Sequence, residues 1–394
     1  MTSIDSLGFP LAYKARIDRW WPQALAGDGI SLRTEVRALE GMQKEALVYY
    51  TPAQTVWRMV SDEGPYLNGT DLAPFPLAFF TAGMAFSFVA ELLKQAEAEN
   101  ITLNHLKLTQ DNYYTMEGSA IRGDMTGGVL PAELVIEGDT DASQTQIDML
   151  VRAAANTSPA QAYMRDALQN IFSLSHNGDL MNVERVQPTY VPYTDPKPHF
   201  ETVRLGDQHP RADIITKLEA ARSLHNVEGG AGSSLKSDQK RTLHVRGEVT
   251  VQDDGLLQAR VQLLKPIGST FRFLCDHQQE NSPKASTPSP LAYLAAGVGF
   301  CFMTQVGRYA TIVKQDLKAY RIVQDTVFKM NARVATAEPV NTHLFIETSE
   351  PVKAAQKTLS MSEQTCFLHA AMRTICPSII TAKLVSSASQ ARTS

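Results

Sequence analysis

The sequence predicts an α+β protein made of two tandem domains. The two halves of the chain repeat one another without a gap, and each half places β-rich segments around apolar helices. In addition, 43% of the 394 residues are hydrophobic, which is enough to form two buried cores. We therefore expect two domains of similar architecture within one chain.

The repeat relates residues 41–87 to residues 255–301. Both stretches contain Pro-Leu-Ala followed by Ala-Gly, at residues 76–83 and 290–297. Further identities are Gly41 with Gly255, Pro52 with Pro266, Arg58 with Arg272, Asp62 with Asp276, and Pro74 with Pro288. This ungapped match indicates an internal duplication. It predicts a first domain over 1–178 with an N-terminal extension, a linker over 179–236, and a second domain over 237–394.

In the first half, the longest apolar stretch predicts a buried helix over 76–99. Strands are predicted over 103–108 and 134–138, followed by a second helix over 143–155. The linker is rich in proline, but its residues 212–224 have helical periodicity and predict a helix.

The second half begins with a β-hairpin whose turn is Asp253-Asp254-Gly255. Pro290 then opens a buried helix that runs to about Lys314, since proline is favoured at the first helical position. A second helix is predicted over 352–374. Strands are predicted over 242–250, 256–264, 271–274, 320–334, 343–348 and 379–385.

Composition excludes several classes of function. The net charge of −4 provides no basic surface for nucleic acid. The apolar run at residues 75–90 is interrupted by Thr81 and Ser87 and is shorter than the roughly 20 residues of a membrane span. No secretory signal precedes it. We expect a soluble, cytoplasmic protein without a membrane or nucleic-acid partner.

The four cysteines all lie in the second half. They show no CxxC pair and no Cys/His zinc spacing, so neither a metal nor another cofactor is expected. Their small number in so long a chain argues against a secreted disulfide framework. Redox or nucleophilic chemistry is the expected use of these thiols.

Three cysteines stand where the first half has serine, and one of them, Cys275 opposite Ser61 on a predicted strand, is expected to be structural. Cys301 is opposite Ser87, and Cys376, which precedes a proline, is matched to Ser158, which also precedes one. Joint replacement suggests that Cys301 and Cys376 form a functional pair. Cys366, ten residues before Cys376, is the alternative partner for Cys301.

These residues carry a family resemblance. Ser-Pro-Leu-Ala-Tyr-Leu-Ala-Ala-Gly at 289–297, followed by Cys-Phe-Met-Thr at 301–304, resembles the central-helix signature of the OsmC/Ohr family, the osmotically inducible and organic hydroperoxide resistance proteins. Cys376-Pro377-Ser378 resembles the second cysteine of that family. The resemblance implies two OsmC-like domains, each an antiparallel sheet with a long buried central helix, paired as an intrachain pseudodimer. Further homodimerisation would be consistent with this arrangement.

The resemblance also implies a thiol peroxidase that reduces organic hydroperoxides. Cys301 would attack the peroxide, Cys376 would close a disulfide, and a dithiol reductant would reopen it. Family members active on organic hydroperoxides have a glutamate where this chain has Leu291, and an arginine to which Arg246 is a loose match. Arg373 and His369 are further candidates to activate a thiol.

The substrate is expected to be small and hydrophobic. The aromatic and sulfur side chains that flank the reactive position would line its pocket; they are Phe86, Phe88, Phe300, Phe302 and Met303. The loops 61–75 and 275–289 lead into the two long helices, so we expect them to shape this pocket. Any replacement for the missing glutamate is expected from these loops or from the other half of the chain.

Two other functions remain open from the sequence. The same fold and cysteine could serve a hydrolase or acyl transferase in which His369 or another base deprotonates the thiol. A non-enzymatic protein could instead bind an apolar ligand between the two halves.

Overall fold

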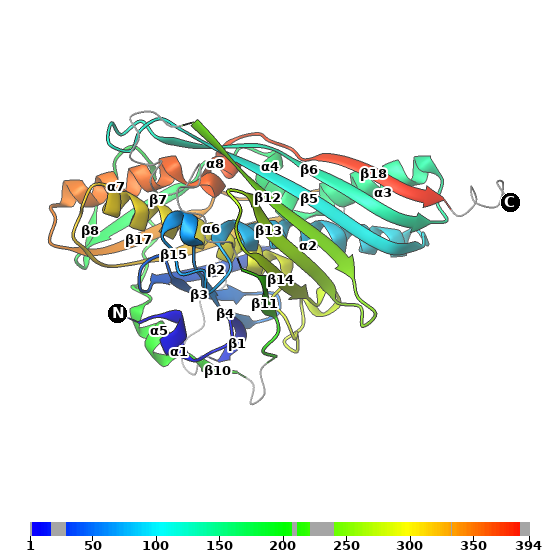
Figure 1. Cartoon of the computed structure of the whole chain (residues 1–394), viewed down its shortest axis with the longest axis horizontal. Coiled ribbons are helices and arrows are strands. Elements are labelled where there is room, and N and C mark those ends of the chain that lie inside the picture. The colour runs from blue at the N-terminus through cyan, green and yellow to red at the C-terminus, as the bar shows by residue number, and fades with distance from the viewer. Residues whose placement is uncertain (1, 17–28, 207–210, 221–239, 332, 387–394) are drawn as a thin grey trace.

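Two long helices form the centre of the molecule (Figure 1): α2 (Pro76–Ala98) and α6 (Pro290–Ile312). The computed structural model describes residues 2–16, 29–206, 211–220, 240–331 and 333–386. The two helices pack directly against each other. A Cβ atom on Gly83 would lie 2.5 Å from the backbone nitrogen of Leu294, and one on Gly297 would lie 2.6 Å from that of Phe80. The repeated Ala-Gly pair therefore permits the close crossing of the helices.

Both central helices begin with a proline in their first turn. Pro76 and Pro290 occupy a position whose N–H has no partner inside a helix. Both helices have the length and composition of a membrane span, but 83% and 94% of their most apolar windows are buried inside the protein. They are the core helices that the sequence predicts.

One sheet has eleven strands among the described residues, and most of its pairs are antiparallel. The order along it is β10 (Arg204–Leu205), β1 (Ala12–Arg16), β4 (Thr55–Ser61), β3 (Lys44–Tyr50), β2 (Ile30–Ala38), β15 (Leu317–Met330), β17 (Asn341–Thr348), β7 (Ile171–His176) and β8 (Asp179–Met181). β16 (Ala335–Ala337) pairs with β15, and β9 (Gln187–Pro188) pairs with β7. We call this sheet A.

The other sheet has seven strands among the described residues, and we call it sheet B. Its order is β11 (Ile215–Glu219), β14 (Thr270–Cys275), β13 (Leu257–Lys265), β12 (Lys240–Val251), β5 (Leu103–Glu117), β6 (Thr126–Thr140) and β18 (Ile379–Ser386). Gly255 has a φ of +81° in the turn between β12 and β13, which explains the glycine of the predicted hairpin.

Each sheet combines strands from both halves of the chain. In sheet A, β2 from the first half pairs with β15 from the second, with Val36 opposite Ile322. In sheet B, β12 from the second half pairs with β5 from the first, with Val249 opposite Leu108. The α+β class is confirmed, and the strands of the two halves are interleaved around the paired central helices.

The helix predicted over 352–374 is two helices in the structure. α7 (Val352–Thr365) ends before Cys366, whose backbone is extended with φ −73° and ψ 119°, and α8 (Phe367–Arg373) follows at once. The first half has the same arrangement, with α3 (Gln144–Thr157), Ser158 and α4 (Pro159–Arg165). Cys366 and Ser158 therefore occupy equivalent breaks.

The segment between the halves contributes to both sheets. Residues 215–219 form strand β11 on the edge of sheet B, so the helix predicted over 212–224 is wrong for that part of the segment. A chain that adds a strand to a sheet edge gains hydrogen bonds that local periodicity does not predict. The shorter helical elements are α1 (Ile4–Leu7), η1 (Pro65–Leu67), α5 (Lys197–Thr202) and η3 (His277–Gln279).

Candidate active site

Two thiols meet in the core of the protein. Cys301 lies within α6, and its sulfur is 3.4 Å from the sulfur of Cys366, in the break between α7 and α8. All four cysteines are unoxidised, and these two are buried. A disulfide requires a sulfur separation of about 2.0 Å, so a small local movement would join the pair.

His369 is the third member of this cluster. Its Nδ1 lies 3.1 Å from the Cys366 sulfur, within the first turn of α8. The imidazole packs between the rings of Phe172 and Phe302, at centroid distances of 5.4 and 5.1 Å. Nε2 is buried and has no hydrogen-bond partner among the described residues. The ring is thus held so that its only described hydrogen bond is to a thiol.

The two thiols have different acidities. Burial raises the pKa of Cys301 well above its ordinary value, and the neighbouring Cys366 adds to this effect. Burial also acts to raise the pKa of Cys366, but the hydrogen bond with Cys301 and the adjacent His369 outweigh it and hold that pKa well below its ordinary value. These directions make Cys366 the more acidic thiol of the coupled pair.

A buried charged cluster adjoins Cys301. Thr304 lies one helical turn along α6, and its hydroxyl donates a hydrogen bond of 3.0 Å to Oε1 of Glu63. The Tyr66 hydroxyl donates to Oε2 of the same carboxylate at 2.7 Å. Glu63 comes from the loop after β4, in the first half, so the surroundings of Cys301 include residues of both halves.

Three basic side chains, Lys44, Arg241 and Arg308, interact electrostatically with Glu63. Burial lowers the pKa of Lys44 and of Arg308, and the charges of Glu63 and Cys301 oppose this effect. Burial and the neighbouring Arg308 lower the pKa of Arg241 to about 9. In their protonated forms, Lys44 and Arg308 can stabilise a thiolate on Cys301 once its proton is removed.

The sequence did not identify Lys44, Glu63, Arg241 or Arg308 as site residues. Glu63 does lie within the loop 61–75, from which a replacement for the family glutamate was expected. Arg241 is buried on β12, and because it precedes Arg246 by an odd number of residues, five, the two side chains lie on opposite faces of the strand. The sequence alone does not show which face of the strand is buried.

Two predicted arginines lie elsewhere. Arg246 faces outward from β12, where its guanidinium binds both carboxylate oxygens of Asp111 at 2.8 Å. Arg373 binds Glu363 at 2.6 Å and also donates to the carbonyl groups of Gly127 and Gln364. Neither arginine has a described contact with the Cys301 or Cys366 sulfur.

Cys376 is also separate from the thiol pair in its described contacts. It follows α8, and its backbone N–H donates to the carbonyl of Met164 at 2.8 Å. Burial raises its pKa. The match of Ser158 to Cys376 is corrected by the helix breaks, which make Ser158 the counterpart of Cys366. A proline follows both Ser158 and Cys376, and this shared feature produced the earlier match.

The first half repeats the geometry with hydroxyl groups. The Ser87 and Ser158 side-chain oxygens lie 2.9 Å apart, and the N–H of Ala160 donates to Ser87. Gln161 occupies the place of His369 and accepts a hydrogen bond from Ser378 at 2.8 Å. The same local structure therefore holds the serine pair in the first half and the cysteine pair in the second. The serine pair has glutamine where the cysteine pair has histidine.

The predicted pocket residues are packed core side chains. Phe300 lies 5.1 Å from Phe79 between ring centroids, and Phe86 lies 5.9 Å from Tyr293. All five predicted pocket residues are fully buried; they are Phe86, Phe88, Phe300, Phe302 and Met303. Neither of the two cavities described for the chain is lined by any of these five residues.

In the described part of the chain, no group of three or more His, Cys, Asp or Glu side chains could hold a metal ion.

Comparison with known proteins gives one family match. Residues 283–381 match the family model described as OsmC-like protein, and this segment contains α6, both thiols of the pair and His369. A similar solved structure is an OsmC-like hydroperoxide resistance protein from Jannaschia sp. CCS1; it is 22% identical, the match covers 31% of this chain and 79% of that one, and the TM-score is 0.20. No curated protein matches this chain.

Proposed function

From an OsmC-like segment that contains two adjacent thiols, we propose that the protein is a cysteine-dependent peroxidase that reduces organic hydroperoxides. The observation that carries this proposal is the 3.4 Å separation of the Cys301 and Cys366 sulfurs. Peroxide reduction with disulfide closure needs two neighbouring thiols, whereas most other cysteine chemistry needs one.

Cys366 is the attacking thiolate in this proposal. It is the more acidic thiol of the pair and lies beside His369. Its sulfur attacks the terminal oxygen of the hydroperoxide, and the O–O bond breaks. The leaving alkoxide takes the proton of Cys301 and departs as an alcohol, while Cys366 becomes a sulfenic acid. This assignment exchanges the roles expected from the sequence, where Cys301 attacks.

Cys301 then closes the disulfide. Loss of its proton leaves a thiolate next to Lys44 and Arg308, whose charges stabilise it. That thiolate attacks the sulfenic sulfur of Cys366, an S–S bond forms, and hydroxide leaves; the proton released when reduced Cys366 returns to its thiolate converts this hydroxide to water. A dithiol reductant returns both cysteines to thiols by two exchange steps and becomes a disulfide itself.

The proposal is tested by turnover of cumene hydroperoxide with dithiothreitol as reductant. Cys301→Ser and Cys366→Ser should each abolish catalytic turnover, and Cys376→Ser serves as the matched control because it also removes a buried thiol. Activity that survives in Cys366→Ser but is lost in Cys376→Ser would contradict the proposed pair.

A cysteine hydrolase or acyl transferase is the second candidate. The 3.1 Å contact between His369 and Cys366 favours it, since a nucleophile and a base within hydrogen-bonding reach are the requirement of that chemistry. Cleavage of p-nitrophenyl esters by Cys301→Ser, with no peroxide turnover by the wild-type protein, would support the hydrolase instead.

A further inference from the structure

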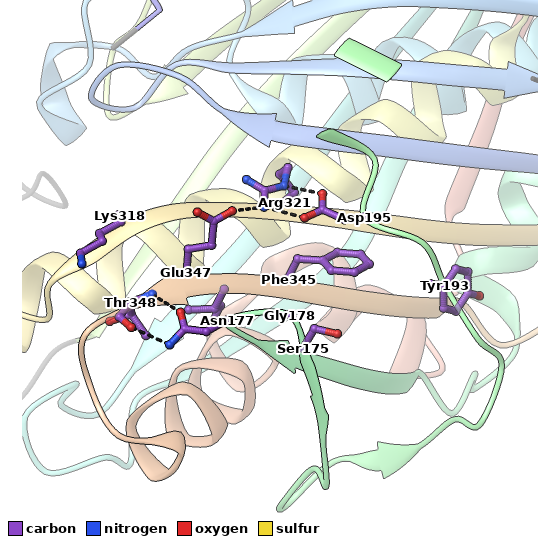
Figure 2. A pocket seen from close by; sticks show the side chains of 11 residues that line it. Ser175, Asn177, Gly178, Tyr193, Asp195, Lys318, Arg321, Phe345, Glu347 and Thr348 are labelled. Carbon is purple, nitrogen blue, oxygen red and sulfur yellow. Dashed lines mark hydrogen bonds and ion pairs between the residues drawn. The ribbon is translucent and has the colours of Figure 1, made fainter. Parts of the chain in front are cut away.

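A cavity of about 590 Å³ lies on sheet A (Figure 2). Its side chains come from β7, β15, β17 and the segment that follows β9. Leu344 and Ile322 belong to the hydrophobic core, and side chains alternate along a strand, so Phe345 and Arg321 face the opposite side of the sheet. The cavity is therefore separated from Cys301 and Cys366 by the sheet.

The wall of the cavity is fixed by ionic contacts. Asp195 binds Arg321 through both carboxylate oxygens, at 2.6 and 2.7 Å. Two residues earlier, the Tyr193 hydroxyl donates to Asp325 at 2.9 Å, and Asp325 is itself held by Arg33. The segment over the sheet is thus attached at two points, and the cavity is formed before any ligand arrives.

The floor of the cavity is uncharged. Ser175 lines it and is hydrogen bonded at 2.8 Å to Nε2 of His343, whose Nδ1 contacts Ser173 at 2.7 Å. Burial lowers the pKa of His343 to about 4, so the imidazole is neutral at pH 7. The Phe345 ring lies 4.1 Å from the imidazole between centroids. Figure 2 shows this ring between Ser175 and the Arg321–Asp195 pair.

The charged groups of the lining balance one another. Lys318 and Arg321 supply two cations, while Asp195 and Glu347 supply two carboxylates. Among the described residues, the Lys318 ammonium, Nη1 of Arg321 and Oε2 of Glu347 have no hydrogen-bond partner. The lining therefore offers both donors and acceptors but no net charge.

We propose that this cavity binds a neutral saccharide. Ring hydroxyl groups both donate and accept, so they can use the ammonium, the guanidinium and the carboxylates together. The apolar C–H face of a pyranose can pack on Phe345 and Tyr193, which also line the cavity. An anion would meet two carboxylates, and a purely apolar ligand would leave charged groups without solvent. The volume is within the range of small-molecule sites.

The test is saturation-transfer difference NMR on the full chain with maltose and glucose as probes and L-phenylalanine as a zwitterionic comparison. We expect maltose to bind with a dissociation constant on the order of 1 mM. Lys318→Met and Glu347→Gln should each weaken binding about tenfold, because each removes a charge-assisted hydrogen bond. Lys329→Met is the matched control, since Lys329 lies on the same strand but pairs with Glu338 outside the cavity.

The aromatic face is tested separately by Phe345→Leu, which keeps an apolar side chain and should weaken maltose binding several-fold. Circular dichroism melting of every variant shows whether the fold is intact. Absence of a maltose or glucose signal from the wild-type protein at about 50 mM would overturn the proposal. So would sugar binding unchanged by Lys318→Met and Glu347→Gln, or tighter binding of L-phenylalanine than of either sugar.

Discussion

The sulfur atoms of Cys301 and Cys366 lie 3.4 Å apart although 65 residues separate them in the chain. Cys301 is fixed by the central helix α6, and Cys366 by the extended break between α7 and α8. His369 contacts the second sulfur and not the first in the described structure. From this asymmetry we expect the two thiols to have different chemical roles, and the first two predictions rest on it.

The order of attack can be read from single substitutions. In Cys301→Ser the sulfenic acid on Cys366 cannot be resolved, so cumene hydroperoxide followed by dimedone should label Cys366, as mass spectrometry would detect. Cys366→Ser should leave Cys301 unlabelled or slowly labelled, since burial raises its pKa. Rapid labelling of Cys301 in Cys366→Ser, with none of Cys366 in the other variant, would reverse the roles.

His369→Gln should make Cys366 less acidic. The substitution installs the residue that the first half has at this place, Gln161, and removes the imidazole that lowers the Cys366 pKa. The pH midpoint of iodoacetamide alkylation should move upward, and the rate at a fixed pH below it should fall about tenfold for each pKa unit. His105→Gln changes an exposed histidine and is the control. An unchanged midpoint would show that His369 has only a packing role.

Stability should depend on the protonation of Glu280. Burial, with the nearby Glu91, raises the pKa of Glu280 from 4.5 to about 7. The folded state then binds more protons than the unfolded state between these pH values, so the free energy of unfolding falls as pH rises through this window. In Glu280→Gln, the decrease in the free energy of unfolding across this window should be smaller than in the wild type by about 1 to 3 kcal/mol.

Urea unfolding at pH 4.5 and at pH 7.5 measures this dependence, as a difference between the wild type and the variant. Glu99→Gln, on the exposed end of α2, controls for the loss of a surface carboxylate. Equal pH dependence in wild type and Glu280→Gln would refute the assignment.

The crossing of the central helices should not tolerate a methyl group. In Gly297→Ala the new Cβ would lie 2.6 Å from a backbone nitrogen of α2, and the two helices would have to separate. We expect a loss of about 3 kcal/mol or more in the free energy of unfolding. Gly299→Ala, in the same helix, meets a methyl group of Val36 at 2.9 Å and should cost less. Similar losses in chemical denaturation of both variants would contradict this explanation.

The first-half hydroxyl pair should not take part in turnover. Ser87→Ala removes a hydroxyl whose described partners are Ser158 and the Ala160 N–H. Peroxidase turnover should stay within about twofold of wild type, because a serine beside glutamine has no base to activate it. Loss of turnover in Ser87→Ala, with an unchanged melting temperature, would place the reaction in the first half.

Local sequence patterns were sufficient for the central elements of the fold. Pro290 begins α6 because proline suits the first helical turn, and the helix is buried because it is apolar around most of its circumference. The hairpin turn requires a positive φ at residue 255, and glycine adopts this conformation without steric cost. The repeat also pointed to Cys301 and Ser87. They occupy equivalent positions on the two central helices, and both helices can be recognised from local sequence alone.

The sequence by itself thus determined the α+β class and the two long core helices, and it pointed to Cys301 on one of them as the candidate reactive position. Only the tertiary structure decided that Cys366, rather than Cys376, meets Cys301, because this depends on a break in a helix and on how that helix packs on α6. It likewise brought Glu63 from the first half to a cysteine of the second. These contacts join residues distant in the chain, and their free energy comes from packing and charge interactions that no local periodicity encodes.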